Sequence, residues 1–280
     1  MSYLIGIDIG GSKIAAGLVK GNKVLKKASF STPMEKKALM DTIFKAIESF
    51  SEYEVSGIGI GAAGSVDEKG NWLESPNIRC VRNIPLKKMI HKRFRKKVEV
   101  NNDANCFALG ESAAGTGKKM KTVFGLILGT GTGGGIVINN RIISGRDFLA
   151  GEIGAIPFKG KHAEEFCSGR FIKRAARKHG IKPDPYLISD MALKGNRKAM
   201  RIYEEFGKNV GELLAIIICV INPDIVVVGG GVSNNFRFFR KSMISAMRNN
   251  LFFKEAHNTP VRLHKLKDYG IVGASMLIRA

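Results

Sequence analysis

The chain has 280 residues, of which 44% are hydrophobic, and carries 45 lysines and arginines against 24 acidic residues, a formal net charge of +21. No apolar run approaches the roughly 20 residues of a membrane span, and no basic leader precedes an apolar segment at the N-terminus. We therefore expect neither a membrane protein nor a secretory signal. The cysteines show no CxxC spacing, which argues against a disulfide framework or a zinc ribbon and fits a reducing cytoplasm.

The positive charge favours anionic ligands in the long-range field. Its densest cluster is KKMIHKRFRKK, residues Lys87–Lys97. Few aromatic residues interleave with these charges, whereas surfaces that stack nucleic-acid bases need them. We interpret the cluster as a solvated helix face and expect no specific nucleic-acid partner.

The first third of the chain opens with three predicted antiparallel strands. Tyr3–Ile9 and Ile14–Val19 are apolar runs, and KGNK, with Gly21-Asn22 at its centre, predicts a hairpin turn before Val24–Phe30. The pattern then predicts a helix at Lys36–Ser49, a buried strand at Val55–Ala62 ending in GAAG, a helix at Leu86–Arg95, a strand at Val98–Asn101, and a helix at Ala104–Ala114 with Asp103 as its N-cap.

The opening pattern then recurs. VFGLILGTGTGGGIVINNRIISG (Val123–Gly145) is a strand, a glycine-rich turn, a strand, an Asn-Asn turn and a third strand. Placing Gly6 on Gly125 also places Gly10 on Gly129, which indicates an internal duplication. Further elements are predicted as helices at Glu164–Lys178, Arg197–Val220 and Phe236–Asn249, a strand at Asp224–Val228, and a C-terminal helix at Val272–Ile278.

Strands followed by alternating helices and strands, twice over, predict an α/β fold of two duplicated lobes with a cleft between them. We place the first lobe at residues 1–115, completed by the C-terminal residues 268–280, and the second at residues 116–267. The sequence GTGKK, which follows Ala114, is a plausible hinge.

Two glycine-rich turns carry the candidate chemistry. GTGTGGG (Gly129–Gly135) contains the GxGxxG spacing, but a strand follows it, whereas a dinucleotide-binding fingerprint requires a helix. We interpret it, like Gly10–Ser12, as a hairpin turn whose exposed N–H groups can cradle a phosphate. Ordinary hairpins are the alternative. Additional donors are supplied by Ser12, Lys13, Thr130 and Thr132.

These motifs resemble, in order along nearly the whole chain, those of the ROK family of sugar kinases, which have the actin/hexokinase-type, ribonuclease-H-like fold. The matching segments are Asp8 with Gly10–Lys13, VNNDAN (Val100–Asn105), Gly129–Gly135, GEIG (Gly151–Gly154) with Glu164, Ser168 and Gly169, and IVVVGGGVSNN (Ile225–Asn235). The resemblance implies an ATP- and Mg²⁺-dependent hexose kinase, with the 6-hydroxyl of glucose as the default acceptor.

Asp103 would be the general base that accepts the sugar hydroxyl proton, although it could also act only as an N-cap. Asp8 would hold Mg²⁺ through water, the alternative being a buried structural carboxylate. The resemblance implies further sugar contacts from Gly64, Asn77, Asn102, Glu152 and Glu164, with Gly61–Gly64 as the wall under the sugar. It implies nucleotide contacts from Asp8, Gly10, Gly11, Ser12, Lys13, Gly129, Thr130, Gly131, Thr132, Gly133, Gly229, Gly230 and Gly231.

The chain departs from the family at one loop. Most members carry a histidine directly after GEIG and a cysteine-rich zinc loop before the next helix. Here Ala155 takes the place of the histidine, and the loop holds only Cys167. We therefore predict no zinc site. His162 could replace the missing sugar contact or could simply be exposed, so the identity of the sugar stays open.

Several alternatives remain at this stage. The acceptor could be fructose, mannose or an N-acetylhexosamine, and the donor could be polyphosphate bound along a basic groove. A DNA-binding sugar sensor is a third possibility, but the first strand begins two residues after Met1, which leaves no room for a helix-turn-helix. Family members are often dimers, so we expect a cytoplasmic homodimer with a hexose and ATP as ligands.

Overall fold

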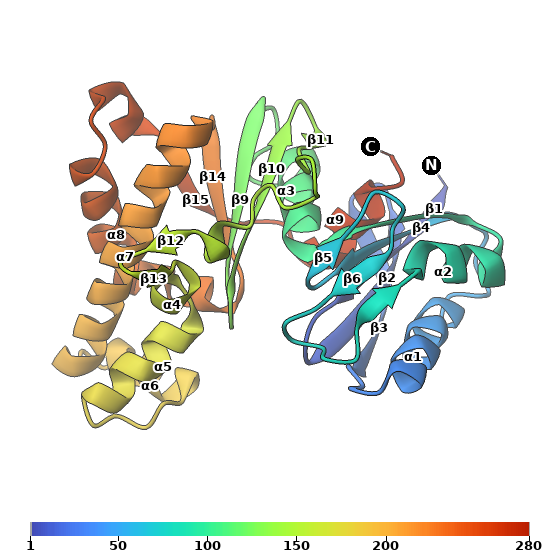
Figure 1. The fold of residues 1–280 in the computed structure, drawn as a ribbon, viewed down its shortest axis with the longest axis horizontal. Coiled ribbons are helices and arrows are strands. Elements are labelled where there is room, and N and C mark those ends of the chain that lie inside the picture. The colour runs from blue at the N-terminus through green and yellow to red at the C-terminus, as the bar shows by residue number, and fades with distance from the viewer. Residues whose placement is uncertain (1, 280) are drawn as a thin grey trace. The chain divides into compact units, whose positions relative to one another are not determined.

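The computed structural model describes residues 2–279. The contacts between Cα atoms divide the chain into two units (Figure 1). Unit 1 comprises Met1–Lys121, Gly135–Gly151 and Lys265–Ala280, and unit 2 comprises Thr122–Gly134 and Glu152–His264. This division assigns residues 135–151 to unit 1, whereas the sequence analysis placed them in the second lobe. The domain boundaries stay a prediction.

Unit 1 is built on a five-stranded sheet in the order β3-β2-β1-β4-β8. The first three strands are antiparallel, whereas β4 and β8 lie parallel to β1 and to each other. The residue ranges are β1 Tyr3–Ile9, β2 Lys13–Lys20, β3 Lys23–Ser31, β4 Val55–Ala62 and β8 Lys97–Asn102. All five strands were predicted from the sequence, to within one residue at each end.

Successive side chains of β1 point to opposite faces of this sheet, and the two faces pack against different helices. Ile5, Ile7 and Ile9 join a core cluster with the buried faces of α1 (Lys36–Glu48) and α2 (Leu86–Phe94). On the other face, Gly6 leaves room for the backbone of α9 (Tyr269–Met276), since a Cβ there would collide with Ile271. The helix α3 (Asp103–Ala114) packs beside α9. The sheet therefore presents its glycine-rich face to the two helices that border the candidate site.

A small three-stranded sheet lies between β4 and α2 in the chain and was not predicted. It consists of β5 (Ser65–Val66), β6 (Trp72–Glu74) and β7 (Arg82–Ile84). Trp72 is fully buried, and its Nε1 donates to the Ala63 carbonyl oxygen at 3.0 Å. The sheet thus orders residues 65–84, which include Asn77.

The second sheet repeats the first. Its order is β11-β10-β9-β14-β15, with β14 parallel to both β9 and β15. The ranges are β9 Thr122–Leu128, β10 Thr132–Ile138, β11 Arg141–Ile142, β14 Ile225–Gly229 and β15 Val261–Leu263. The strand β10 begins in unit 2 and continues into unit 1. In both sheets two strands joined by a glycine turn precede parallel strands, so the duplicated α/β fold is confirmed.

The helices of unit 2 are α4 (Glu164–Cys167), α5 (Gly169–Lys178), α6 (Pro185–Leu193), α7 (Arg197–Ile221) and α8 (Phe236–Asn249), with short strands β12 (Pro157–Phe158) and β13 (Lys161–His162) and 3-10 turns η1 (Ile153–Ala155), η2 (Gly231–Asn235) and η3 (Lys254–Asn258). The expected single helix at Glu164–Lys178 was wrong. Its backbone is extended at Ser168, whose Oγ accepts from Arg170 N and so begins a new helix.

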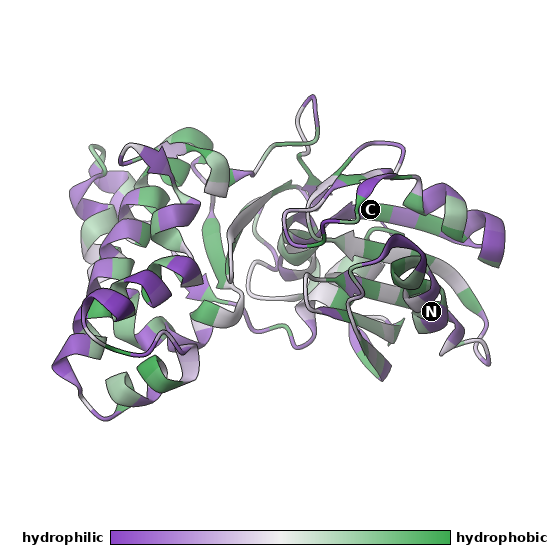
Figure 2. Ribbon diagram, turned by 60° about the horizontal axis from the view of Figure 1, so that its bottom comes forward, coloured by the Kyte–Doolittle hydropathy of each residue, from purple (hydrophilic) through white to green (hydrophobic). Residues whose placement is uncertain are grey.

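The amphipathic character of the helices is visible in Figure 2, where purple, hydrophilic residues run along the helices of each unit. The 25-residue helix α7 packs closely on α8 because Gly207 and Gly211 lie at the contact, where a Cβ would meet the α8 backbone. Across residues 2–279, the structure contains no helix that is both long and apolar enough to span a bilayer.

Candidate active site

The first glycine turn joins β1 to β2. Gly10 N donates to Lys13 O at 2.9 Å, which closes the turn. Thr32 fixes it from the side, with its hydroxyl donating to Gly10 O at 2.8 Å and its N–H to Ser12 O at 3.2 Å. Ser12 and Lys13 are exposed. The turn is therefore held rigidly by the sheet while its donors remain available to an anion.

Gly11 brings this turn against a second predicted site residue. A Cβ at Gly11 would lie 2.7 Å from the Asn77 Cβ, so only glycine permits the observed contact. The segment ordered by the small sheet therefore places the Asn77 side chain beside the first glycine turn. The structure brings these two predicted residues together within unit 1.

Asp8 lies one residue before the end of β1, where it pairs with Gly61 of β4. Burial and the neighbouring Asp103 carboxylate raise the pKa of Asp8 to about 7, and Lys13 opposes the shift. The N-terminal turn of α9 packs on this carboxylate, since a Cβ at Gly270 would collide with it. Asp8 is thus a partly desolvated carboxylate that a bound cation would readily stabilise.

The entry to α3 differs in one respect from the prediction. Asn102, not Asp103, is the N-cap, and its Oδ1 accepts from Ala104 N at 2.8 Å and from Asn105 N at 3.3 Å. The Asn102 Nδ2 donates to Gly64 O at 2.8 Å. Gly64 has φ +109° and contacts the backbone at Glu74, which explains why glycine is needed there. Asp103 is consequently the first residue of the helix and is not its N-cap.

Asp103 keeps its carboxylate near the helix start, where one oxygen accepts from Ala104 N at 3.0 Å. Burial raises the pKa of Asp103, and the backbone hydrogen bonds partly offset that shift. Asp8 and Asp103 interact electrostatically, and the pKa of the nearby Cys106 thiol is raised by burial first and then by the Asp103 and Asp8 carboxylates. Two carboxylates with raised pKa values therefore converge at the edge of one sheet.

Two asparagines that the sequence analysis did not single out complete this group. Asn101 Oδ1 accepts from Asn102 N at 2.8 Å and from Asn105 Nδ2 at 2.9 Å. The Oδ1 of Asn105 is buried and has no hydrogen-bond partner among the described residues. Asn101, Asn102 and Asn105 all lie within VNNDAN. The density of amide side chains in this motif could have indicated from the sequence that Asn101 and Asn105 belong to the site. The network fixes the strand-to-helix junction that presents Asp103.

The second glycine turn belongs to unit 2 and is followed by a strand, as predicted. Gly129 N donates to Gly131 O at 2.9 Å, and Gly129 O accepts from Gly169 N at 2.8 Å, so the start of α5 supports the turn. The hydroxyl of Thr132 is buried and donates to Cys167 O at 2.8 Å, whereas Thr130 is exposed. Thr132 therefore helps to hold the turn, and the free hydroxyl is that of Thr130.

Glu164 binds this turn directly. Its Oε2 accepts from Thr132 N at 3.0 Å, and its Oε1 lies 2.8 Å from Arg170 Nη1. A Cβ at Gly131 would collide with the carboxylate. Both oxygens already have partners in unit 2, so the structure shows Glu164 as a support of the glycine turn.

Ala155, which stands where most family members carry a histidine, has another histidine hydrogen bonded to its backbone. The hairpin of β12 and β13 turns His162 back so that its Nδ1 lies 2.8 Å from Ala155 O, a hydrogen bond in the Nδ1-protonated tautomer. His162 is exposed. Glu152 is also exposed and precedes the 3-10 turn that contains Ala155. The imidazole is therefore hydrogen bonded to the backbone of Ala155.

The last predicted motif ends β14. Gly230 has φ +84° and touches the Leu128 backbone, so the fold requires glycine at this position. Gly231 has a negative φ, and a Cβ there would meet no protein atom within 4 Å. The fold therefore does not require glycine at position 231.

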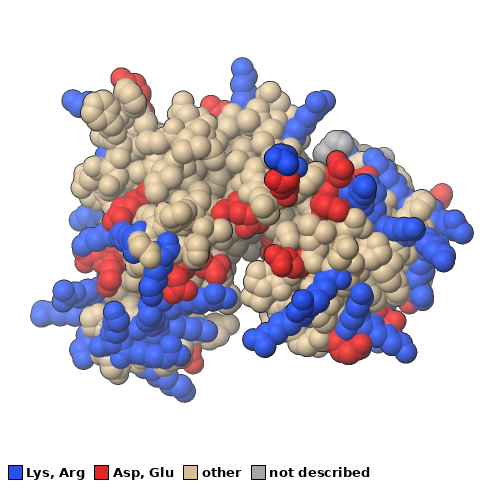
Figure 3. All heavy atoms as spheres, viewed as in Figure 1, with Lys and Arg blue, Asp and Glu red and all other residues tan. Residues whose placement is uncertain are grey.

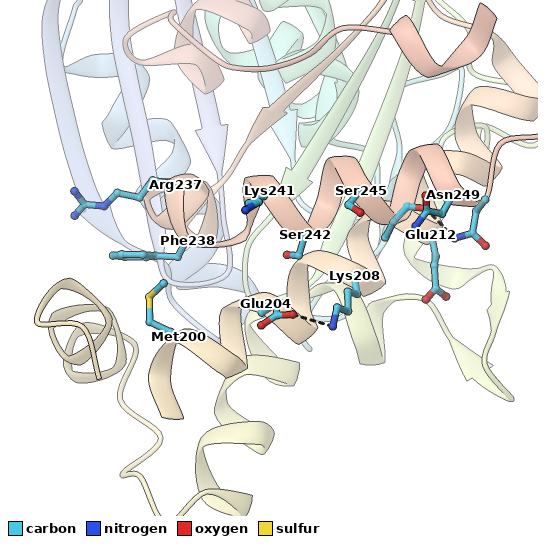
Figure 4. A pocket seen from close by; sticks show the side chains of 12 residues that line it. Met200, Glu204, Lys208, Glu212, Arg237, Phe238, Lys241, Ser242, Ser245 and Asn249 are labelled. Atoms are coloured by element: carbon cyan, nitrogen blue, oxygen red, sulfur yellow. Dashed lines mark hydrogen bonds and ion pairs between the residues drawn. The ribbon is translucent and has the colours of Figure 1, made fainter. Parts of the chain in front are cut away.

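A groove of about 730 Å³ lies between α7 and α8 (Figure 4). Figure 4 shows that charged and polar side chains line it, with the Glu204–Lys208 ion pair of 2.9 Å on one wall. None of the predicted site residues lines the groove. Within residues 2–279, no three His, Cys, Asp or Glu side chains are grouped so that they could hold a metal ion.

The comparisons with known proteins agree with these motifs. The ROK family profile matches residues 4–280. This chain belongs to the ROK family. It is 31% identical to the glucokinase of Thermotoga maritima, over 99% of this chain and 97% of that protein. It is also 31% identical to the N-acetyl-D-glucosamine kinase of Haemophilus influenzae, over 97% and 98% of the two chains.

A solved ROK structure supports the same assignment. The ROK glucokinase of Streptomyces griseus, crystallised with glucose and AMPPNP, superimposes with a TM-score of 0.86 at 32% identity and covers 98% of both chains. Together these relatives identify the chain as a ROK sugar kinase with the fold predicted from its sequence. The relatives named above differ in their sugars, so membership of the family does not by itself define the acceptor.

Proposed function

We propose that this ROK kinase transfers the γ-phosphate of ATP to the 6-hydroxyl of glucose. The observation that carries the proposal is the Asp103 carboxylate, held at the start of α3 beside Asp8 by a network of asparagine amides. A base of this kind beside a phosphate-binding turn suits phosphoryl transfer to an alcohol, because that reaction depends mainly on positioning and charge neutralisation. Glucose is the acceptor of the similar glucokinases.

The sugar would be held first by residues of unit 1. Asn77 and Asn102 each offer both a donor and an acceptor, which matches the dual character of a hydroxyl group. Gly64 leaves space beside Asn102, to which it is hydrogen bonded. From the family resemblance we also assign sugar contacts to Glu152 and Glu164. Glu164 would then act on the sugar while it supports the Gly131 turn.

The phosphates would bind the N–H groups of the two glycine turns, with Ser12, Lys13 and Thr130 as further donors.

Mg²⁺ fits the residues present. Asp8 is a partly desolvated carboxylate next to a second carboxylate, and Mg²⁺ keeps most of its waters and needs few protein ligands. Asp8 would hold the ion through water, and the ion would neutralise charge on the phosphates. The exposed position of Gly231 fits the adenosine.

In the chemical step the oxygen of the sugar hydroxyl attacks the γ-phosphorus, and the bond between that phosphorus and the ADP oxygen breaks. Asp103 accepts the proton of the hydroxyl at the same time. The proton ends on Asp103, which releases it to solvent after the product leaves. The raised pKa of Asp103 makes it a stronger base than an ordinary carboxylate. The asparagine network holds the base in place while the proton moves.

An N-acetylhexosamine is the second candidate acceptor, and the 31% identity to an N-acetyl-D-glucosamine kinase favours it over other sugars. His162 beside Ala155 is the feature most able to distinguish the two. We propose that its free ring nitrogen contacts the sugar, in place of the side chain that Ala155 lacks.

The test is a coupled assay of ADP release with Mg-ATP over glucose, mannose, fructose, N-acetylglucosamine and N-acetylmannosamine, with a parallel arm that replaces ATP by polyphosphate. We expect glucose to give the highest kcat/KM and ATP to be the donor. His162→Ala should raise the KM for the best sugar and leave the KM for ATP unchanged. A higher kcat/KM for an N-acetylated sugar would replace glucose, and turnover only with polyphosphate would contradict the proposed donor.

A further inference from the structure

The segment from α5 to the start of α7 concentrates the positive charge of unit 2. Residues 170–201 contain ten lysines and arginines against two carboxylates, Asp184 and Asp190, a net charge of +8 in a chain of +21. In Figure 3, blue lysine and arginine side chains gather at the lower end of unit 2, where Figure 1 places α5 and α6. So dense a charge creates a local field that attracts an anionic partner.

Most of these cations are free of carboxylate partners. Three of the ten form ion pairs, which are Arg170–Glu164, Arg174–Glu165 and Lys194–Asp190. Within residues 2–279, the other seven make no ion pair and all are exposed; they are Lys173, Arg177, Lys178, Lys182, Arg197, Lys198 and Arg201. The internal contacts of unit 2 therefore do not account for these seven charges.

The two ends of this segment lie side by side. At the start of α7, the Lys198 Nζ donates to the carbonyl oxygen of His179, the C-cap residue of α5, at 3.3 Å. The helix α6 packs against both α5 and α7. The seven cations therefore belong to one surface, which we call the α5–α7 basic patch.

Apolar side chains project from α6, which joins the two groups of cations along the chain. This helix buries Ile188 and Ala192. On its outer side Tyr186 is 87% exposed, Leu193 52% and Leu187 38%. Tyr186 and Leu193 lie seven residues apart and so share one face of the helix. An exposed apolar helix face bordered by cations is the pattern of a helix that lies in the interface of a membrane.

The combination of cations with aliphatic side chains identifies the partner. A nucleic acid would pair with the cations, but leucines gain nothing from a phosphate backbone, and surfaces that stack bases use several aromatic residues. Within residues 170–201, Tyr186 is the one exposed aromatic side chain. An anionic bilayer matches both features, because its headgroups attract the cations and its acyl boundary accepts the tyrosine and the leucines.

We propose that the α5–α7 basic patch docks unit 2 onto a bilayer surface that contains anionic lipid. The cations lie over the headgroups, and the outer face of α6 enters the boundary beneath them. Such a contact is peripheral and needs no spanning helix. It is reversible and weakens as salt screens the exposed charges. This inference depends neither on the proposed sugar nor on the phosphate donor.

The first test is co-sedimentation of the full chain with phosphatidylcholine vesicles, with and without phosphatidylglycerol, at low and at high salt. We expect binding to the anionic vesicles only. Arg177→Glu combined with Lys178→Glu should weaken it at least about tenfold at low salt. The matched control is Lys88→Glu with Lys92→Glu, which makes the same change in net charge on exposed positions of α2 and should bind within about twofold of the wild type.

A leucine variant separates a bilayer from a nucleic acid. Leu193→Ser should weaken vesicle binding severalfold at both salt concentrations, because salt does not screen the apolar contribution. A parallel titration replaces the vesicles with a single-stranded RNA oligonucleotide. Binding to the RNA without binding to the vesicles would overturn the proposal. Vesicle binding that the patch variants weaken no more than the α2 control would also overturn it.

A tryptophan at the centre of the patch reports insertion directly. The chain's own tryptophan, Trp72, is fully buried and supplies a constant background. The emission of Tyr186→Trp should move to shorter wavelength with the anionic vesicles and stay unchanged with the neutral ones. Phe252→Trp is the control, since this side chain is 88% exposed outside the patch. A shift in Phe252→Trp alone would place the contact on another surface and contradict the assignment. Circular dichroism checks that each variant is folded.

Discussion

At the scale of single residues, Asp8 connects function with a cost in stability. Its pKa is about 7 in the folded protein against an ordinary value of 3.8. Between these values the folded protein holds a proton that the unfolded chain has lost, so the free energy of unfolding falls as the pH rises through this window. Above pH 7 Asp8 is ionised in the folded protein as well, and the free energy of unfolding is lowered by the full cost of that buried charge. Because Asp8 is only partly buried, we estimate it at about 1–2 kcal/mol.

Asp8→Asn should therefore melt at a higher temperature than the wild type at pH 8 in the absence of Mg²⁺, and the difference should shrink as the pH falls towards 4. The same variant should lose most of its kinase activity. Thermal unfolding followed by circular dichroism measures the first effect. If the variant melts below the wild type at pH 8, the carboxylate is stabilising and the burial argument is wrong.

Gly231 offers a residue-scale test of the nucleotide site. A side chain at this position meets no protein atom within 4 Å, so Gly231→Leu should fold normally. We expect it to raise the KM for ATP by about tenfold or more, equivalent to about 1.4 kcal/mol, with little change in the KM for the sugar. Gly230→Ala is the matched control, since its φ of +84° and its contact with Leu128 predict a lower melting temperature instead. An unchanged KM for ATP in Gly231→Leu would place the adenosine elsewhere.

At the scale of elements, Glu111 near the end of α3 joins two segments of unit 1. Its carboxylate is fully buried and accepts from Thr116 N at 2.7 Å and from Leu266 N at 3.2 Å. The chain first leaves unit 1 after residue 121 and enters it for the last time at residue 265. Glu111 thus anchors the outgoing and the returning segment to the same helix.

Glu111→Gln keeps the shape of the side chain but replaces one acceptor oxygen with an amide group that cannot accept. We expect a loss of about 1–3 kcal/mol in the free energy of unfolding, the cost of leaving a buried N–H unsatisfied. Glu48→Gln is the control, because Glu48 forms a half-exposed ion pair with Arg93 that should contribute less than about 1 kcal/mol. Urea unfolding measures both. Equal losses in the two variants would show that Glu111 is not an anchor.

Long, regular elements could be predicted because their apolar periodicity is strong. The Asn-Asn turn between β10 and β11 has φ values of 51° and 61°, as its sequence indicates. The break at Ser168 was missed because the residues on both sides have helical patterns, and the extended Ser168 that caps Arg170 N and begins a new helix could not be foreseen from them. The small sheet of residues 65–84 was missed because its strands span two or three residues and depend on the burial of Trp72.

In the candidate site, too, features set by local sequence patterns could be predicted, whereas features that depend on contacts with other segments could not. The sequence predicted Asp8 near the end of a strand, Gly11 in the turn after it and Asp103 at a strand-to-helix junction, and the structure has them there. It misplaced the N-cap of α3, because Asn102 and Asp103 are equally good caps and only the hydrogen bond from Asn102 to Gly64 separates them. The second role of Glu164, as a support of the glycine turn, depends on a contact with Thr132 that lies 32 residues away in the chain.

At the scale of the whole molecule, a duplicated fold of the ROK family carries Asp103, the carboxylate that we propose accepts the proton of the sugar hydroxyl. The duplication supplies two glycine turns, and in the first sheet two coupled carboxylates, Asp8 and Asp103, lie near the strand ends. The central claim is therefore that Asp103 accepts the proton, while the asparagines and Gly64 bind the sugar without it.

Asp103→Asn tests this claim most directly, with kcat and the sugar dissociation constant measured on the same preparation. Our account predicts that kcat falls between about 10²- and 10⁴-fold, whereas the dissociation constant measured by calorimetry changes less than about tenfold. In the wild type, kcat should fall as the pH drops through the raised pKa of Asp103. If the variant keeps more than about a tenth of the wild-type kcat while binding the sugar normally, Asp103 is not the base and the account is contradicted.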